Sequence, residues 1–176
     1  MAANVMVNQG AARVTWTDGL FGGLFAGTIH AVFWIVVEAV WLRDMSIAEV
    51  FQTISSALLG PKAFTLGWIS VVLGIALHFL IAAAFGFIYV SFAKRLRFMT
   101  VVPYSGMCGV LYGLMVWFFM ANVIIPLFHV ENVERLWAAI VGHTLCYGFA
   151  LSEFITLAHR RDVIAEAAQE SSQDGY

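Results

Sequence analysis

Five ionisable side chains fall inside long apolar runs of the sequence, and each could do chemistry inside a membrane. They are His30, Glu38, His78, His143 and Glu153. Polar groups at membrane depth are costly, so they are usually paired or functional. Imidazoles can bind iron or another metal, carry protons or hydrogen-bond between helices, and carboxylates can relay protons or pair with basic residues. The chemistry depends on which elements bring these groups together.

Small residues flank two of the histidines at helical spacing. His78 shares its stripe of the helix with Gly74 and Ala82, and His143 shares its stripe with Ala139. Two neutral imidazoles that face each other at one depth can supply both axial ligands of a b-type haem, and small neighbours leave room for the flat macrocycle. One hypothesis is therefore a b-type haem bound by His78 and His143.

Two other interpretations of the histidines stay open. Each ring could hydrogen-bond to a neighbouring helix, which fixes helix register without a cofactor or a metal. Alternatively, His30 and Glu38, which lie about two turns apart on the first apolar run, could line a proton or small-solute path. We prefer the hydrogen-bonding interpretation, and hence no cofactor, because three single histidines come without a second motif.

Both carboxylates lie near the ends of their apolar runs, where long side chains can reach water or a basic partner. Glu38 is expected to reach water or Arg43, and Glu153 to reach Arg95 or Arg97. We interpret both carboxylates as structural ion-pairing groups rather than as proton relays.

The composition requires a membrane. Of the 176 residues, 61% are hydrophobic and 11% are charged, whereas a soluble domain is about half apolar and about one quarter charged. A domain of this size cannot bury so many apolar residues in its core. The apolar surface that stays exposed therefore needs lipid as a partner. The net charge of −2 and the lack of a large basic cluster exclude nucleic acid as a partner.

Four apolar runs are each long enough to cross a bilayer core, which takes about 20 residues. They are Gly19–Leu42, Leu66–Phe92, Tyr104–Phe128 and about Asn132–Ala158. Thr17 or Asp18 is expected to cap the first helix, and Pro126 to bend or end the third. The sequence therefore predicts an all-α, polytopic membrane protein that folds as a four-helix transmembrane bundle.

Lys and Arg residues set the predicted orientation, because cytoplasmic loops carry the excess of positive charge. Six basic residues lie on one side of the spans and three on the other. Both termini and the second loop are therefore expected in the cytoplasm. The chain divides into a cytoplasmic N-terminal segment (1–18), a transmembrane domain (19–158) and a polar cytoplasmic tail that frays (159–176).

The first loop contains a helix of its own. Ser46 and Glu49 form a capping-box pattern, apolar residues follow at helical spacing, and Gly60 ends the run. We predict a short amphipathic helix near Ser46–Leu59 on the outer surface, which either covers the mouth of the bundle or gates it.

Small residues four apart suggest tight helix packing and an internal duplication. The packing positions are Gly19, Gly23 and Gly27 on the first helix and Gly109 and Gly113 on the third. A duplicated hairpin implies a pseudo-twofold axis along the membrane normal, so helices one and three are expected to meet at the bundle centre. Asn122, across the third helix from Gly113, is expected to hydrogen-bond a neighbouring helix or a second protomer.

A set of aromatic, glycine and histidine motifs spans nearly the whole chain. The motifs are Leu66-Gly-Trp68, Leu77-His78-Phe79, Gly109-Val-Leu-Tyr-Gly113, Pro126-Leu127, Gly142-His143 and Tyr147-Gly148. This pattern resembles the small bacterial inner-membrane proteins related to the YagU type. The resemblance implies a multi-pass protein of the bacterial inner (plasma) membrane, and it brings no catalytic residues with it.

The sequence also lacks the short motifs of common enzymes. It contains no G-x-x-x-x-G-K-[ST], H-E-x-x-H, C-x-x-C or G-x-S-x-G pattern, and its loops are too short for a catalytic domain. We therefore expect no enzyme activity, and we interpret the chain as an accessory or assembly subunit, in a homo-oligomer or a larger membrane complex. The alternatives are the b-haem redox protein using His78 and His143 and a small channel or transporter using His30 and Glu38.

Overall fold

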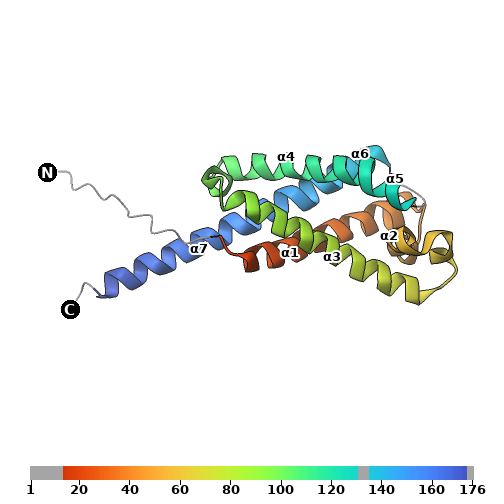
Figure 1. The fold of residues 1–176 in the computed structure, drawn as a ribbon, viewed down its shortest axis with the longest axis horizontal. Coiled ribbons are helices and arrows are strands. Elements are labelled where there is room, and N and C mark those ends of the chain that lie inside the picture. Colours follow the sequence, from red (N-terminus) through yellow and green to blue (C-terminus); the bar gives the residue numbers. More distant parts are fainter. Residues whose placement is uncertain (1–13, 131–134, 174–176) are drawn as a thin grey trace.

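The computed structural model describes residues 14–130 and 135–173, and this part of the chain is helical without any strand (Figure 1). Four of its helices are long and apolar enough to cross a membrane, which confirms the predicted all-α four-helix fold. Their bounds are Trp16–Leu42, Trp68–Ala93, Tyr104–Phe128 and Leu136–Gln169. The predicted start of the fourth span, near Asn132, lies outside the described residues.

Each span is built from one or more helical elements. The first comprises α1 (Trp16–Trp34) and a π-helical segment (Ile35–Leu42), and the second is α3 (Trp68–Ala93). The third comprises α4 (Tyr104–Phe119), a π-helical segment (Met120–Ile124) and α5 (Ile125–Phe128). The fourth comprises α6 (Leu136–Val141), a π-helical segment (Gly142–Phe149) and α7 (Ala150–Gln173), and α2 (Ile47–Leu59) lies between the first two spans.

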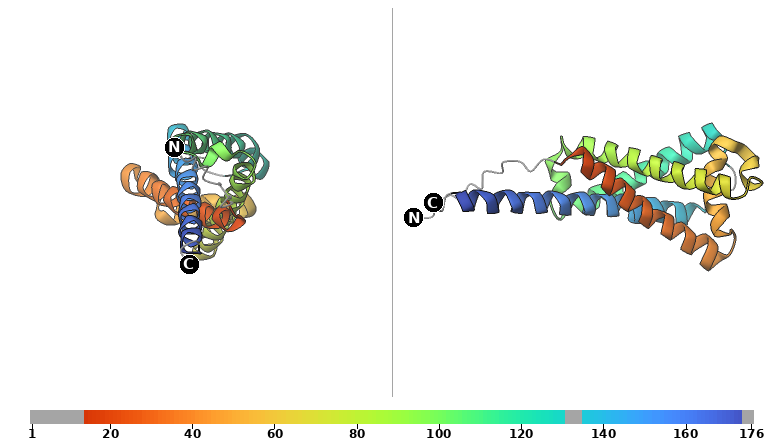
Figure 2. Two further views of the ribbon diagram at one scale, coloured as in Figure 1. Left: turned by 90° about the vertical axis from the view of Figure 1, so that its left-hand side faces the viewer. Right: turned by 90° about the horizontal axis from the view of Figure 1, so that it is seen from below.

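Two helix ends differ from the prediction. The first span begins at Trp16 because Thr15 caps it, with the Asp18 carboxylate accepting from the Thr15 amide in a capping box, so neither Thr17 nor Asp18 is the cap residue. At the other end of the chain, α7 continues as helix through Gln173 and extends beyond the bundle (Figure 2), where we expected a frayed tail. The tail is rich in Ala, Glu and Gln, which are good helix formers and keep the helix intact.

The helix in the first loop is present, with Ser46 and Glu49 in the predicted capping box. It does not lie loosely on a surface. Its Phe51 backbone packs against Gly74 of α3, and Gln52 donates a hydrogen bond to Ser70 at 3.3 Å. The helix therefore closes the end of the bundle away from the chain termini.

The capping box of α2 is expected to make this closure sensitive to acid. The Ser46 amide, 2.7 Å from the Glu49 carboxylate, lowers the pKa of Glu49 below its ordinary value. The cap stabilises α2 fully above the ordinary glutamate pKa of about 4.3 and loses its effect as the pH falls below that value. Amide exchange in α2, corrected for intrinsic rate, should therefore rise below about pH 4. Ser46→Ala should raise amide exchange in α2 at neutral pH, because it should lower the local stability of the helix by about 0.5–2 kcal/mol. Exchange that changes neither at low pH nor in Ser46→Ala would contradict this role of the capping box.

The small-residue faces pack within each hairpin. Gly23 of α1 lies against the backbone of Ala82 and Ala83 of α3, and Gly19 lies against Gly86. Because both helices carry small residues at the crossing, their backbones meet directly.

The second hairpin repeats this arrangement. Gly109 of α4 faces Gly148 and Ser152, and Gly113 faces the carbonyl of His143. The prediction that the first and third helices meet through their glycines is therefore wrong, because each glycine face is already covered by the small residues of its own hairpin partner.

The two hairpins do not contact each other symmetrically. The first span packs along the fourth. A twofold axis would pair α3 and α4 in the same way, but these two helices touch near the terminal end and diverge toward α2 (Figure 1). Near the terminal end, the Tyr112 hydroxyl donates to the Phe85 carbonyl at 2.5 Å, and the rings of Tyr89 and Tyr112 lie 5.0 Å apart. The divergence leaves a space between α3 and α4 at the α2 end.

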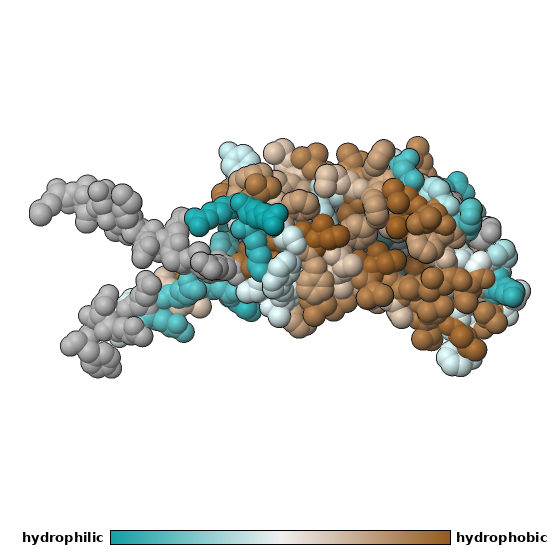
Figure 3. Space-filling view, in the orientation of Figure 1, coloured by the Kyte–Doolittle hydropathy of each residue, from teal (hydrophilic) through white to brown (hydrophobic). Residues whose placement is uncertain are grey.

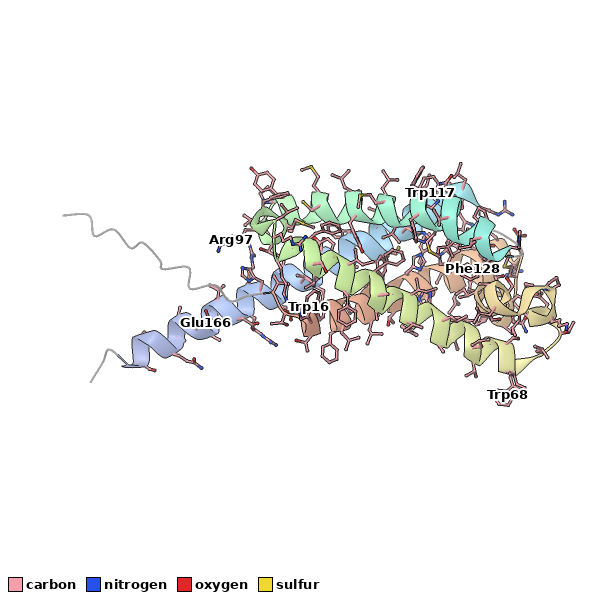
Figure 4. The ribbon with its side chains drawn as sticks, in the orientation of Figure 1. Trp16, Trp68, Arg97, Trp117, Phe128 and Glu166 are labelled. Atoms are coloured by element: carbon pink, nitrogen blue, oxygen red, sulfur yellow. The ribbon has the colours of Figure 1, made fainter. Side chains whose placement is uncertain are left out.

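The outside of the bundle is suited to lipid. Figure 3 shows apolar residues over most of the visible face and polar residues toward the two ends. Trp16 and Trp68 lie at opposite ends of this apolar zone (Figure 4), as expected of interfacial anchors. The ammonium group of Lys94 lies 3.9 Å from the centre of a Trp16 ring, which marks the terminal end of the zone.

Candidate intramembrane binding site

Three histidines from three spans converge in the middle of the bundle. The ring of His30 stacks on that of His78, with centroids 5.7 Å apart, and meets the ring of His143 edge-on at 4.6 Å. His30 and His143 are each about 8% exposed. The sequence placed each histidine on a helix face that carries small residues, but it did not predict that His30 would contact both other rings.

The hydrogen bonds of the rings fix where their protons lie. The Trp34 indole N–H donates to His30 Nε2 at 3.1 Å, and an indole nitrogen is only a donor, so His30 is neutral and carries its proton on Nδ1. His78 Nε2 donates to the Gly27 carbonyl and His143 Nδ1 to the Ala139 carbonyl, both at 2.8 Å. Of these three bonds, only the one from His78 joins two spans, as the preferred interpretation predicted for every ring. The bonds of His30 and His143 lie within their own spans, so the prediction is wrong for those two bonds.

A cavity of about 270 Å³ lies beside the histidines, between α3 and α4 and under α2. Figure 3 shows a hollow between apolar side chains in this part of the bundle. Its polar wall is formed by the three histidines, Tyr147, Glu38 and Thr53, whose Oγ1 has no hydrogen-bond partner among the described residues. The remaining wall is mostly apolar and aromatic. This volume is close to the lower limit of small-molecule sites, about 300 Å³.

All three π-helical segments of the described chain border this cavity. The first carries Glu38, the second carries Met120 and Ala121, and the third carries His143 and Tyr147. A π-helical turn is wider than an α-helical turn and redirects side chains, and such turns are frequent at functional sites. The sequence did not predict these π-helical segments. One local indication of the second segment was Pro126, whose missing N–H disturbs the helical turn before it.

Glu38 is the unusual member of the site. It is only 5% exposed, and its Oε1 has no hydrogen-bond partner among the described residues. The predicted pairing with Arg43 is not among the ion pairs of the described residues. Arg43 is the left-handed residue at which the helix ends. The nearby Arg135 pairs instead with Asp44, which raises the pKa of Arg135.

Two other predicted polar residues lie away from the cavity and have different partners from those expected. Glu153 accepts a hydrogen bond from Ser105 at 3.2 Å, and no ion pair with Arg95 or Arg97 is formed in the described residues. Asn122 donates to the Phe118 carbonyl of its own helix at 2.8 Å, and among the described residues its amide group makes no bond to another span. Glu153 therefore joins the third and fourth spans, whereas Asn122 bonds within its own helix.

The geometry does not fit a haem between His78 and His143. Since the ring of His30 contacts both, a macrocycle between them would have to displace it. The Nε2 of His78 is already used on the Gly27 carbonyl, and the described residues that line the cavity include no Lys or Arg to pair with propionates. In the chain as described, no group of three or more His, Cys, Asp or Glu side chains is arranged to hold a metal ion.

Comparison of the chain with protein-family models, with curated proteins and with solved structures finds no match. The site is therefore interpreted from its own geometry.

Proposed function

We propose that this multi-pass membrane protein binds a small molecule in its intramembrane cavity and acts as a carrier, without catalysis. The observation that supports this proposal best is the buried Glu38 carboxylate, whose Oε1 is unpartnered and which lines the same cavity as His30, His78 and His143. An unpaired carboxylate oxygen at a buried position is unfavourable for folding, and a ligand that hydrogen-bonds to it would offset this cost. An accessory or assembly subunit would need the helix packing but not this cavity.

The shape of the bundle supports a carrier rather than an open channel. The terminal half is filled by a packed cluster that includes the fully buried Tyr89, Leu151 and Ile155. The cavity lies on the other side of this cluster, toward α2. A mid-membrane site closed on one side is the arrangement used by carriers that expose their site alternately.

Binding can be tested without knowing the natural ligand. We expect at least one of 2-phenylethylammonium, 2-phenylethanol and 3-phenylpropionate to raise the unfolding temperature of the protein in lipid nanodiscs, because a ligand of the folded state stabilises it. The compounds share an aromatic body that suits the apolar wall and differ in their polar group. If none of them shifts the transition at concentrations that leave empty nanodiscs intact, the proposal is wrong.

We further propose that the protein lies in the bacterial inner membrane with both chain termini in the cytoplasm. The support is the charge bias, with Lys94, Arg95 and Arg97 next to the terminal end of α3. In a variant whose two native cysteines are replaced by alanine, a cysteine at position 97 should react with a membrane-impermeant maleimide only after the cells are opened. Labelling of the cysteine at position 97 in intact spheroplasts would contradict the proposed orientation.

A further inference from the structure

We infer that the cavity prefers a small lipophilic ammonium ion, with Glu38 as its counter-ion; this inference rests on the proposed ligand-binding function and specifies its ligand class. Three features of the cavity support this ligand class: the hydrogen-bonding state of the histidines, the charge of the lining residues and the aromatic character of the remaining wall.

The polar wall presents mainly hydrogen-bond acceptors. His78 and His143 use their N–H groups on backbone carbonyls, so, as neutral rings, they keep a lone pair on Nδ1 and Nε2 respectively. The Tyr147 hydroxyl likewise donates to the Ala82 carbonyl at 2.6 Å. With Glu38 Oε1, these acceptors outnumber the two uncommitted donors of the wall, the Nδ1–H of His30 and the hydroxyl of Thr53, whose Oγ1 has no partner among the described residues. A ligand with several N–H donors therefore matches this wall better than a ketone or quinone, which only accepts hydrogen bonds.

The charge of the lining has one sign. Glu38 is the one Asp, Glu, Lys or Arg residue among the described residues that line the cavity. Arg135, which interacts electrostatically with Glu38, is not among the described residues that line the cavity, and it pairs with Asp44. A buried carboxylate is stabilised by a cation that hydrogen-bonds to it and is destabilised by an anion. A carboxylate or phosphate ligand is therefore disfavoured.

The rest of the wall suits the apolar body of such a cation. Trp34, Trp117, Phe51 and Phe85 all line the cavity. Aromatic faces attract ammonium groups and cover aryl or alkyl chains. The cavity thus offers a carboxylate and lone pairs for the charged head and aromatic surface for the tail.

Four probes that share one phenylethyl body separate these effects. We expect affinity in nanodiscs, measured by equilibrium dialysis, to fall in the order primary ammonium, trimethylammonium, alcohol and methyl ether. The trimethylammonium keeps the charge but has no N–H donor, the alcohol has one donor without charge, and the ether has neither. The primary ammonium should bind roughly thirtyfold or more tightly than the ether, as expected for a buried, hydrogen-bonded charge pair.

A Glu38→Gln variant supplies the matched control, because the amide keeps the size of the side chain and removes its charge. In this variant the preference for the primary ammonium over the alcohol should fall to about threefold or less. Equal wild-type affinities for the ammonium and the ether, or an unchanged preference in the folded Glu38→Gln variant, would overturn the ammonium assignment while leaving the cavity as a ligand site. Failure of every probe to bind would instead overturn the proposed function. The wild-type series remains decisive even if the variant does not fold.

Discussion

Replacing Gly113 by alanine is expected to lower the free energy of unfolding of the bundle by about 1–3 kcal/mol. A Cβ at this position would meet the carbonyl of His143 and the Cα of Thr144, which are backbone atoms of the facing span and cannot turn aside. The loss should outweigh the gain in helix propensity, which is about 1 kcal/mol for alanine over glycine. Titration with a denaturing detergent, followed by circular dichroism, measures the difference.

Gly106, two turns earlier on α4, provides the control. A Cβ there would meet the ring of Phe149, which is 44% exposed and can turn toward lipid. Gly106→Ala should therefore be neutral or mildly stabilising. If Gly113→Ala and Gly106→Ala have the same effect, the direct backbone contact between α4 and the fourth span is not important for stability.

A tryptophan at position 121 is expected to reduce ligand affinity by at least roughly a hundredfold, or about 2.7 kcal/mol. Ala121 lies in the second π-helical segment and lines the cavity between α3 and α4. An indole in a cavity of about 270 Å³ would occupy much of the space that the ligand needs. Dialysis with the phenylethyl probe that binds the wild type most tightly measures the loss.

Met115 on α4 provides the matched position for this substitution, because it is 57% exposed on the lipid-facing surface. Met115→Trp should bind the probe as the wild type does and unfold at a similar temperature. Equal binding by Ala121→Trp and the wild type would mean that the probe binds elsewhere.

The elements of the fold could be predicted because they depend on local patterns. Apolar runs long enough to span a bilayer predicted four helices, and the third was predicted with the observed bounds, Tyr104–Phe128. The capping box of Ser46 and Glu49 predicted α2 for the same reason, since its hydrogen bonds join residues three apart. The position of α7's end was missed because a polar composition does not distinguish an exposed helix from a frayed tail.

The sequence predicted which polar residues form the site, but it did not predict how they are arranged. Helical spacing placed His30, His78 and His143 on helix faces that carry small residues, but their convergence depends on how the two hairpins pack. Small residues on several faces allow more than one packing arrangement, so the sequence did not determine it. The lack of a partner for Glu38 depends on the Arg135–Asp44 pair, whose members are far apart in sequence. The divergence of α3 from α4 is also a property of the whole bundle, and it breaks the symmetry that the duplicated glycines suggested.

Photolabelling tests the central claim, that the protein binds a small molecule inside the bundle. A phenylethylammonium that carries a diazirine on its ring would be irradiated with the protein in nanodiscs, and the modified residues identified by mass spectrometry. We expect modification of cavity residues such as Phe51, Phe85 and Trp117, suppressed by excess unlabelled ammonium and absent in Ala121→Trp. Modification confined to lipid-facing residues such as Met115 and Phe118, with no suppression by the unlabelled compound, would contradict the claim.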